Sequence, residues 1–341
     1  MKKYSSLLFA CFIAWLLVGC SSKTSSEKQS DIRPIPVIFD TDMGNDVDDA
    51  LALDILYKSM DKGDINLLAL MLNKKGEGAA KFLDIMNTWY GYPQLPIGIA
   101  KNIEDGNENT NYAQSVCDLN LFPTTLTDYA NLPDAHILYR KLLAAQPDHS
   151  VVIISTGFST NLARLLDTPA DEYSDLNGKE LIKQKVKYMS LMAGAIKMAD
   201  HREFNIIQDL PAAQKLFAEC PVPLVTSPFE VGNAIKYPAK SIENDFGWAP
   251  QHPMVEAYKA YMQMPYDRQT WDLTAVLQVL HPNEYMTCSE EGKITVDEVG
   301  LTHFVPMKGG MQYYLMTNEE QNQKILDYFL NIIPQKPKSK Q

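Results

Sequence analysis

Residues 38–51 read IFDTDMGNDVDDAL, in which the end of an apolar strand is followed by five aspartates within ten residues and then by an apolar helix. In open α/β folds, ligands bind outside the carboxyl ends of the strands, where this acidic cluster is expected to lie. Like charges packed together there cost free energy unless a cation neutralises them, and oxygen ligands favour Ca²⁺ or Mg²⁺ over Zn²⁺. The alternative is a solvated acidic loop with one helix cap, but five acids in this context favour a metal site.

Two other acidic motifs fit these residues less well. An EF-hand loop that began at Asp40 would need glycine and glutamate where the chain has Asn45 and Leu51, so it is excluded. A phosphatase of the haloacid dehalogenase type also begins with an apolar strand and Asp-x-Asp. Its motif continues with Thr or Val where this chain has Gly44, which leaves it as the weaker alternative.

From residue 34 onward, short apolar runs alternate with longer amphipathic segments, the pattern of a mostly parallel sheet with helices on both faces. The predicted strands are residues 36–39, 66–72, 95–100, 151–155, 187–192 and 223–226. The predicted helices are residues 48–60, 78–90, 134–146, 161–166 and 211–219. Beyond residue 229 more helix is expected, then strands at 294–296, 301–305 and 311–316. We therefore expect a single large Rossmann-like α/β domain over residues 34–334, followed by a disordered tail at 335–341.

Charge and cysteine content exclude two classes of protein. The chain has 42 acidic and 31 basic residues, a formal charge of −11 that repels polyanions, so no nucleic acid polymer is expected as a partner. Five cysteines without a C-x-x-C pair argue against a disulfide scaffold and a thiolate zinc cluster. A globular enzyme or binding protein remains.

The N-terminus has the features of a secretory signal. Residues 1–19 begin with two lysines and continue with a short apolar stretch. Residues 17–20 read LVGC and resemble a bacterial lipobox, which predicts cleavage before Cys20 and its acylation. An ordinary signal that ends near a chance cysteine is the weaker alternative. We expect a protein of the bacterial cell envelope that contacts the membrane only through its lipid anchor, with Ser-rich residues 20–33 as a flexible linker.

The acidic stretch resembles the N-terminal signature of the inosine-uridine preferring nucleoside hydrolase family. Further segments resemble that family in chain order: Asn73, STGFSTN at 155–161, LMAG at 191–194, EFNI at 203–206 and WD at 271–272. The resemblance covers roughly residues 36–280. It implies a nucleoside hydrolase-like fold and Ca²⁺-dependent cleavage of a ribonucleoside to ribose and free base, a reaction of purine and pyrimidine salvage.

The resemblance also implies a role for each matched residue. Asp42, Asp49, the backbone carbonyl of Thr156 and Asp272 would ligate Ca²⁺. Asp42 would also be the general base, with Asp40 beside the ligands. The implied substrate-binding residues are Asp48, Asn73, Met192, Glu203 and Asn205. Members of the family are commonly dimers or tetramers, so a homo-oligomer is an expectation.

The chain departs from the family pattern at three places. Asn45 and Asp46 form a two-residue insertion, and Asp46 is equally compatible with an outer acid of the site and a solvated loop residue. No asparagine lies between Met192 and Glu203, where the family usually offers one to the ribose.

The third departure is Trp271, which replaces the histidine that in many members helps to protonate the departing base. Indole has no acidic proton to give. Purine-specific members instead stack the base between aromatic rings, so Trp271 is predicted as a catalytic stacking residue; a tryptophan that only fills the core is the alternative. His201 is a weaker candidate for the acid. The competing function is a ribose- or nucleoside-binding lipoprotein that keeps the metal site but has weakened catalysis.

Overall fold

The computed structural model describes residues 34–103, 111–249 and 251–341, and the fold is that of this part of the chain. The predicted signal peptide, Cys20 and the linker lie outside the described residues. Within the described residues no helix is both long and apolar enough to cross a membrane. The described residues from Pro34 onward form one compact unit.

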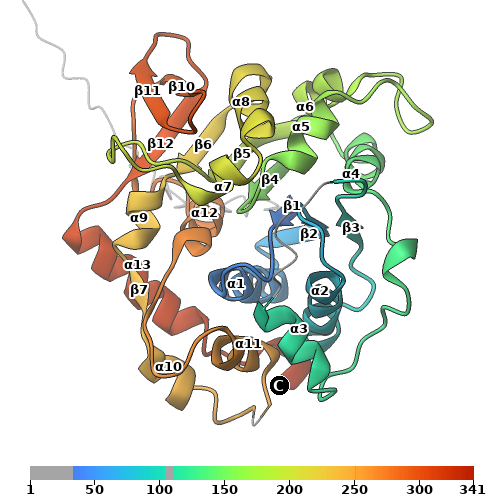
Figure 1. Ribbon diagram of the computed structural model, residues 1–341, viewed down its shortest axis with the longest axis vertical. Coiled ribbons are helices and arrows are strands. Elements are labelled where there is room, and N and C mark those ends of the chain that lie inside the picture. The colour runs from blue at the N-terminus through green and yellow to red at the C-terminus, as the bar shows by residue number, and fades with distance from the viewer. Residues whose placement is uncertain (1–33, 104–110, 250) are drawn as a thin grey trace, which may run out of the picture. The chain divides into compact units, whose positions relative to one another are not determined.

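A ten-stranded mixed sheet runs through the described residues in the order β11-β10-β12-β6-β5-β4-β1-β2-β3, with β9 paired to β12 (Figure 1). The strands are β1 Ile35–Thr41, β2 Ile65–Leu72, β3 Ile97–Ile99, β4 Val151–Ser155, β5 Val186–Met192, β6 Leu224–Ser227, β9 Thr287–Cys288, β10 Gly292–Val296, β11 Thr302–Pro306 and β12 Gln312–Met316. A separate pair consists of β7 Lys236–Tyr237 and β8 Arg268–Gln269. All pairings from β12 through β6 to β3 are parallel, whereas β9, β10 and β11 pair antiparallel.

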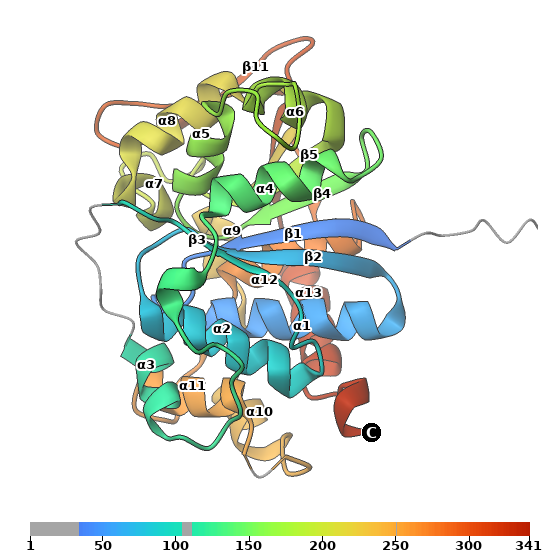
Figure 2. The same cartoon turned by 90° about the vertical axis from the view of Figure 1, so that its right-hand side faces the viewer.

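Helices cover both faces of the sheet, as expected (Figure 2). They are α1 Asp48–Lys62, α2 Glu77–Tyr90, α3 Asn111–Asp118, α4 Ala135–Ala144, α5 Thr160–Leu166, α6 Gly178–Lys185, α7 Phe204–Gln208, α8 Leu210–Glu219, α9 Phe229–Asn233, α10 Ala239–Asn244, α11 Pro253–Tyr261, α12 Trp271–Leu280 and α13 Glu319–Ile332, with the 3₁₀ helices η1 Tyr129–Asn131 and η2 Lys338–Lys340. Each predicted strand and helix overlaps an observed one.

Alternation along the buried strands explains why the sheet needs both helical layers. Val37 and Phe39 of β1 pack into the core with α1, α2 and α12, whereas Ile38 packs into the core with α4, α5 and α8. Successive side chains of a strand point to opposite faces. Because both faces of β1 are apolar, both must be covered by helices.

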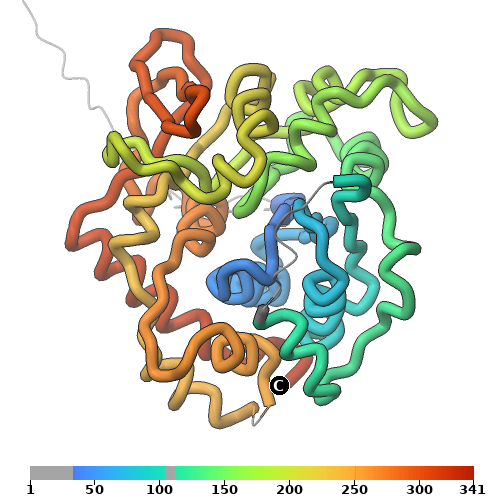
Figure 3. The backbone as a smooth tube through the Cα atoms, in the orientation of Figure 1, coloured from blue at the N-terminus to red at the C-terminus, as the bar shows by residue number. Residues whose placement is uncertain are grey.

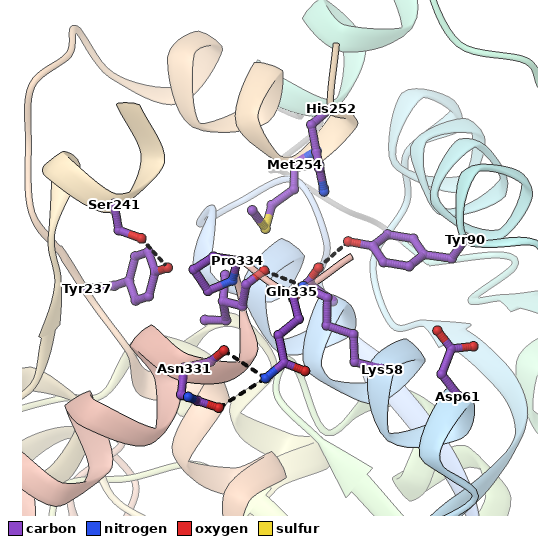
Figure 4. A network of polar contacts seen from close by, with 12 residues as sticks. Lys58, Asp61, Tyr90, Tyr237, Ser241, His252, Met254, Asn331, Pro334 and Gln335 are labelled. Carbon is purple, nitrogen blue, oxygen red and sulfur yellow. Dashed lines mark hydrogen bonds and ion pairs between the residues drawn. The ribbon is translucent and has the colours of Figure 1, made fainter. Parts of the chain in front are cut away.

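The C-terminal tail corrects one sequence-based expectation. Residues 335–341 are not disordered, because η2 packs on the helices α1 and α2. The Lys338 backbone N–H donates to Asp61 at 2.8 Å, and the Ser339 hydroxyl donates to the Trp89 carbonyl at 3.1 Å. Just before the tail, Lys58 donates to the carbonyl of Ile333, and Gln335, the first residue of the tail, donates to Asn331 (Figure 4). Polar groups on two helices thus hold a segment whose composition looks solvated.

Candidate active site

The sheet order places the acidic cluster at a topological switch point. From β1 the chain adds β2 and β3 on one side, and then returns to add β4, β5 and β6 on the other. Asp42 follows β1, and Thr156 follows β4, its neighbour in the sheet. Crevices at such positions are the usual ligand sites of open α/β sheets.

A cavity of about 330 Å³ lies at this place. Segments far apart in the chain line it: the β1–α1 connection, the starts of α7 and α12, and the α11–α12 connection. Figure 3 shows how the backbone folds to bring distant parts of the chain together. Nine of the predicted site residues line it: Asp42, Asp48, Asp49, Thr156, Met192, Glu203, Asn205, Trp271 and Asp272. Asn45, Asp46, Phe204, Phe229, Tyr261 and Arg268 complete the lining.

Four aspartates of this lining have pKa values raised above the usual range. Burial raises the pKa of Asp42 to about 6 and holds those of Asp48, Asp49 and Asp272 well above the usual range, with repulsion among the carboxylates adding to the effect. Asp49 accepts from the Thr41 hydroxyl, and Asp48 accepts from the Asp272 backbone N–H at 3.0 Å.

The chemistry of these donors fits a hard divalent cation. All are oxygen atoms, nearly inaccessible to solvent, and a cation would relieve the repulsion that raises their pKa values. In the part of the chain that the structure describes, no three carboxylate, imidazole or thiol groups are already gathered as a set of metal ligands. The proposed ligands thus fit Ca²⁺ because all their donor atoms are oxygens and because they line the same cavity.

Asn45 and Asp46, the inserted residues, both have partners. Asn45 donates to the Asp42 carboxylate at 2.6 Å and accepts from the buried Lys74 ammonium at 2.5 Å. Asp46 pairs with Arg268 through two hydrogen bonds. Of the two alternatives for Asp46, the structure favours an outer acid of the site: it lines the cavity as the partner of a distant arginine, and its charge helps to raise the pKa values of Asp42, Asp48 and Asp49.

Asp40 and Asn73 lie behind the cavity lining. Asp40 is fully buried and accepts from the Tyr139 hydroxyl at 2.8 Å and from Asn73 at 2.7 Å. Burial raises its pKa to about 7, although these bonds lower it. The Asn73 amide oxygen accepts from the Phe158 backbone N–H at 3.0 Å, so both ends of the amide are used. Asn73 is not among the residues that line this cavity, and its contact with Asp40 holds that carboxyl from behind.

Glu203 and Asn205 connect α7 to the strand ends. Glu203 accepts from the backbone N–H groups of Gly194 and Asn205, at 3.0 and 2.8 Å, and caps α7. Burial raises its pKa to about 7, against the lowering effect of these bonds. The Asn205 amide donates to the Thr156 carbonyl at 3.0 Å, so the predicted carbonyl ligand and a predicted substrate contact touch each other.

Aromatic side chains form another part of the lining. Trp271 stacks on Phe229 at 5.3 Å between ring centroids and donates its indole N–H to the Phe229 carbonyl at 3.0 Å. It is half-buried and lines the cavity, so it does not merely fill the core. The His201 ring lies tilted against Phe229, with 4.0 Å between ring centroids, and His201 is not among the residues that line the cavity.

Sequence reasoning did not single out Lys74, Phe229, Tyr261 or Arg268 as individual residues. Phe229 and Tyr261 lie in a segment that offers many aromatic residues and no periodic signal to choose among them. Arg268 and Asp46 are 222 residues apart, a separation that no local pattern reveals. The only clue was the insertion itself, which placed an extra acid without a partner in the sequence nearby.

Comparisons with known proteins agree with this fold. The chain matches the family model described as inosine-uridine preferring nucleoside hydrolase over residues 37–329. Among curated proteins none matches it. The purine-preferring ribonucleoside hydrolase from Gardnerella vaginalis has a TM-score of 0.68 at 18% identity, over 88% of this chain and 98% of that chain. The inosine-uridine preferring nucleoside hydrolase from Bacillus anthracis has a TM-score of 0.68 at 16% identity, over 88% and 99%.

A third similar structure is the type III effector protein XopQ, solved in complex with adenosine diphosphate ribose. It has a TM-score of 0.60 at 14% identity, over 88% of this chain and 93% of that chain. At such identities the likeness shows a common fold and no more. The family model, in contrast, spans most of the chain and includes every cavity-lining residue. The chain therefore belongs to the inosine-uridine preferring nucleoside hydrolase family.

Proposed function

We propose that the protein hydrolyses the N-glycosidic bond of a ribonucleoside, with Ca²⁺ as cofactor, to ribose and free base. The observation that carries the proposal is the set of buried carboxylates that the β1–α1 connection and α12 bring to one cavity. Cleavage of this bond builds positive charge on the ribose ring. Carboxylates held in a dry cavity stabilise such charge far better than solvated ones.

Each of these residues would have one or two roles in the reaction. Asp42, Asp49, Asp272 and the Thr156 carbonyl would hold Ca²⁺, which supplies positive charge that orients the ribose hydroxyls and acidifies a water molecule. Asp42 would take the proton of the attacking water, because its buried carboxylate lines the cavity beside the other proposed ligands. Asp48 and Asn205 would bind the ribose diol, and Glu203 would contact the sugar near its 5′-hydroxyl.

A purine base fits the aromatic lining best. Phe229, Tyr261 and Trp271 offer three rings to the cavity, and aromatic rings bind planar bases without requiring a particular hydrogen-bond pattern. A solved structure of similar fold is described as purine-preferring.

We further propose that acylated Cys20 anchors the protein in the bacterial envelope.

The test is an assay for released reducing sugar over purine, pyrimidine and nicotinamide ribosides, with Ca²⁺ or with chelator. Chelator-sensitive release from any of them supports the hydrolase. Silence across the panel, together with measurable binding of ribose by calorimetry, would instead reject the hydrolase and favour a ribose- or nucleoside-binding protein. Asp245→Asn is the matched control, because Asp245 is an exposed aspartate that does not line the cavity and should leave turnover unchanged.

A further inference from the structure

Arg268 is the one cationic side chain among the described residues that line the cavity. Its guanidinium lies 5.1 Å from the Tyr261 ring centre and 5.2 Å from that of Trp271. Its Nε donates to Asp46 at 2.8 Å, and its Nη2 donates to the other oxygen of the same carboxylate. Within the described residues, Nη1 donates to no protein acceptor. The side chain is 19% exposed, so its charge is only partly screened by solvent.

The fixed orientation of this guanidinium matters because the departing base needs assistance. When the C1′–N bond breaks, its electron pair moves onto the base nitrogen, and an unassisted base leaves as an anion. The Trp271 N–H is already donated to the Phe229 carbonyl, and indole is not an acid. The His201 ring lies tilted against Phe229 and does not line the cavity. Tyr261 is the aromatic lining residue with an ionisable group, and burial raises the pKa of its phenol above the usual value, which makes it a poorer acid. The described lining therefore offers no effective acid on the aromatic side and has a cation there instead.

We propose that Arg268 is the leaving-group residue, which stabilises the negative charge of the departing base by charge and by hydrogen bonds without protonating it. This inference rests on the proposed function. The water oxygen bonds to C1′ and its proton passes to Asp42, while the C1′–N electron pair passes to the base. The guanidinium keeps its protons, because arginine does not deprotonate in the working pH range, and the base takes a proton from solvent. Donors already oriented toward developing charge need no reorganisation during the reaction.

Asp46 is the positioning residue for Arg268. A carboxylate that accepts from both Nε and Nη2 sets the plane of the guanidinium, as bidentate pairs do. The rings of Tyr261 and Trp271 further limit where the guanidinium can lie. The inserted acid thus has a function that its position in the sequence does not reveal.

The experiment compares two ribosides that differ in their need for leaving-group assistance. Inosine has a poor leaving group, and 4-nitrophenyl riboside has a good one. We expect Arg268→Gln to lower kcat on inosine by about 10²-fold, the usual cost of removing one such donor, and to leave kcat on 4-nitrophenyl riboside within about threefold. Arg268→Lys should recover part of the loss, because lysine keeps the positive charge but lacks the planar guanidinium with its paired N–H donors. Asp46→Asn should lower kcat on inosine by about 10-fold, in line with loss of a supporting partner.

Equal losses on the two substrates would overturn the assignment and make Arg268 a structural residue. A normal rate on inosine for Arg268→Gln would overturn it as well. Retained turnover of 4-nitrophenyl riboside shows in the same assay that the variant is folded. Lys259→Gln, an exposed cation on α11, is the control and should change neither rate. Failure of the proposed function looks different, since the unmodified protein would then hydrolyse neither riboside with Ca²⁺ present.

Discussion

Asp42 carries two proposed roles at once, those of metal ligand and general base. Replacing it with alanine removes both, so Asp42→Ala should lower kcat by about 10³-fold or more and weaken Ca²⁺ binding. Rates of sugar release and calorimetric Ca²⁺ titration check the two effects separately. Unchanged activity would refute the site assignment. Lost activity with normal Ca²⁺ affinity would leave Asp42 the role of general base but not that of metal ligand.

Replacing the Trp271 ring distinguishes two roles for this residue, stacking on the substrate base and packing within the protein. If it stacks on the base, Trp271→Ala should reduce purine turnover far more than turnover of 4-nitrophenyl riboside. Trp271→Phe should keep much of the activity because a ring remains beside Phe229. Equal losses on the two substrates in Trp271→Ala, with a lowered melting temperature, would favour a packing role.

Among the elements, α1 matters most, since its first turn presents Asp48 and Asp49 to the cavity. Its position depends on a buried pair further along, in which Lys58 donates to Asp54 at 2.8 Å and also to the Ile333 carbonyl. Lys58→Ala leaves Asp54 as an unpaired buried charge. We expect it to lower the free energy of unfolding by about 3–5 kcal/mol.

Chemical denaturation measures this effect. Lys62→Ala, an exposed lysine in the last turn of the same helix, is the control and should stay within about 0.5 kcal/mol of the unmodified protein. The double variant Asp54→Asn with Lys58→Met should be more stable than Lys58→Ala alone, because it removes the buried charges together. A small effect of Lys58→Ala would mean that α1 is held by its apolar contacts alone.

At the scale of the whole molecule, the buried acids make stability depend on pH. Burial raises the pKa of both Asp40 and Glu203 to about 7 in the folded chain, well above their unfolded values. The folded state therefore binds more protons than the unfolded state between about pH 4 and pH 7, and the Ca²⁺-free protein should lose stability as pH rises through that range.

Added Ca²⁺ should reverse the trend, since it binds the deprotonated carboxylates and its stabilisation grows with pH. Thermal denaturation from pH 5 to pH 8, with Ca²⁺ or with chelator, checks both slopes. A melting temperature that is independent of pH and of Ca²⁺ would contradict the buried-acid account of the site.

Local patterns were enough to predict the layered α/β fold. Short continuous apolar runs such as β1 and longer helical segments such as α1 are properties of neighbouring residues, so they can be recognised without knowing the tertiary structure. The same holds for the place of Asp42, because strand carboxyl ends form one edge of a parallel sheet. The tail at 335–341 could not be predicted, since its polar composition says nothing about partners on α1 and α2.

The amino-acid sequence alone thus suffices for the class of fold, the acidic cluster and the family resemblance, all of which depend on residues near one another in the chain. Only the folded chain shows that Asn73 supports Asp40 from behind the cavity, and that Asp46 holds Arg268 beside Trp271. These pairings join residues 33 and 222 positions apart. Contacts over such separations depend on how the sheet is ordered and which loops meet above it, which no periodicity encodes.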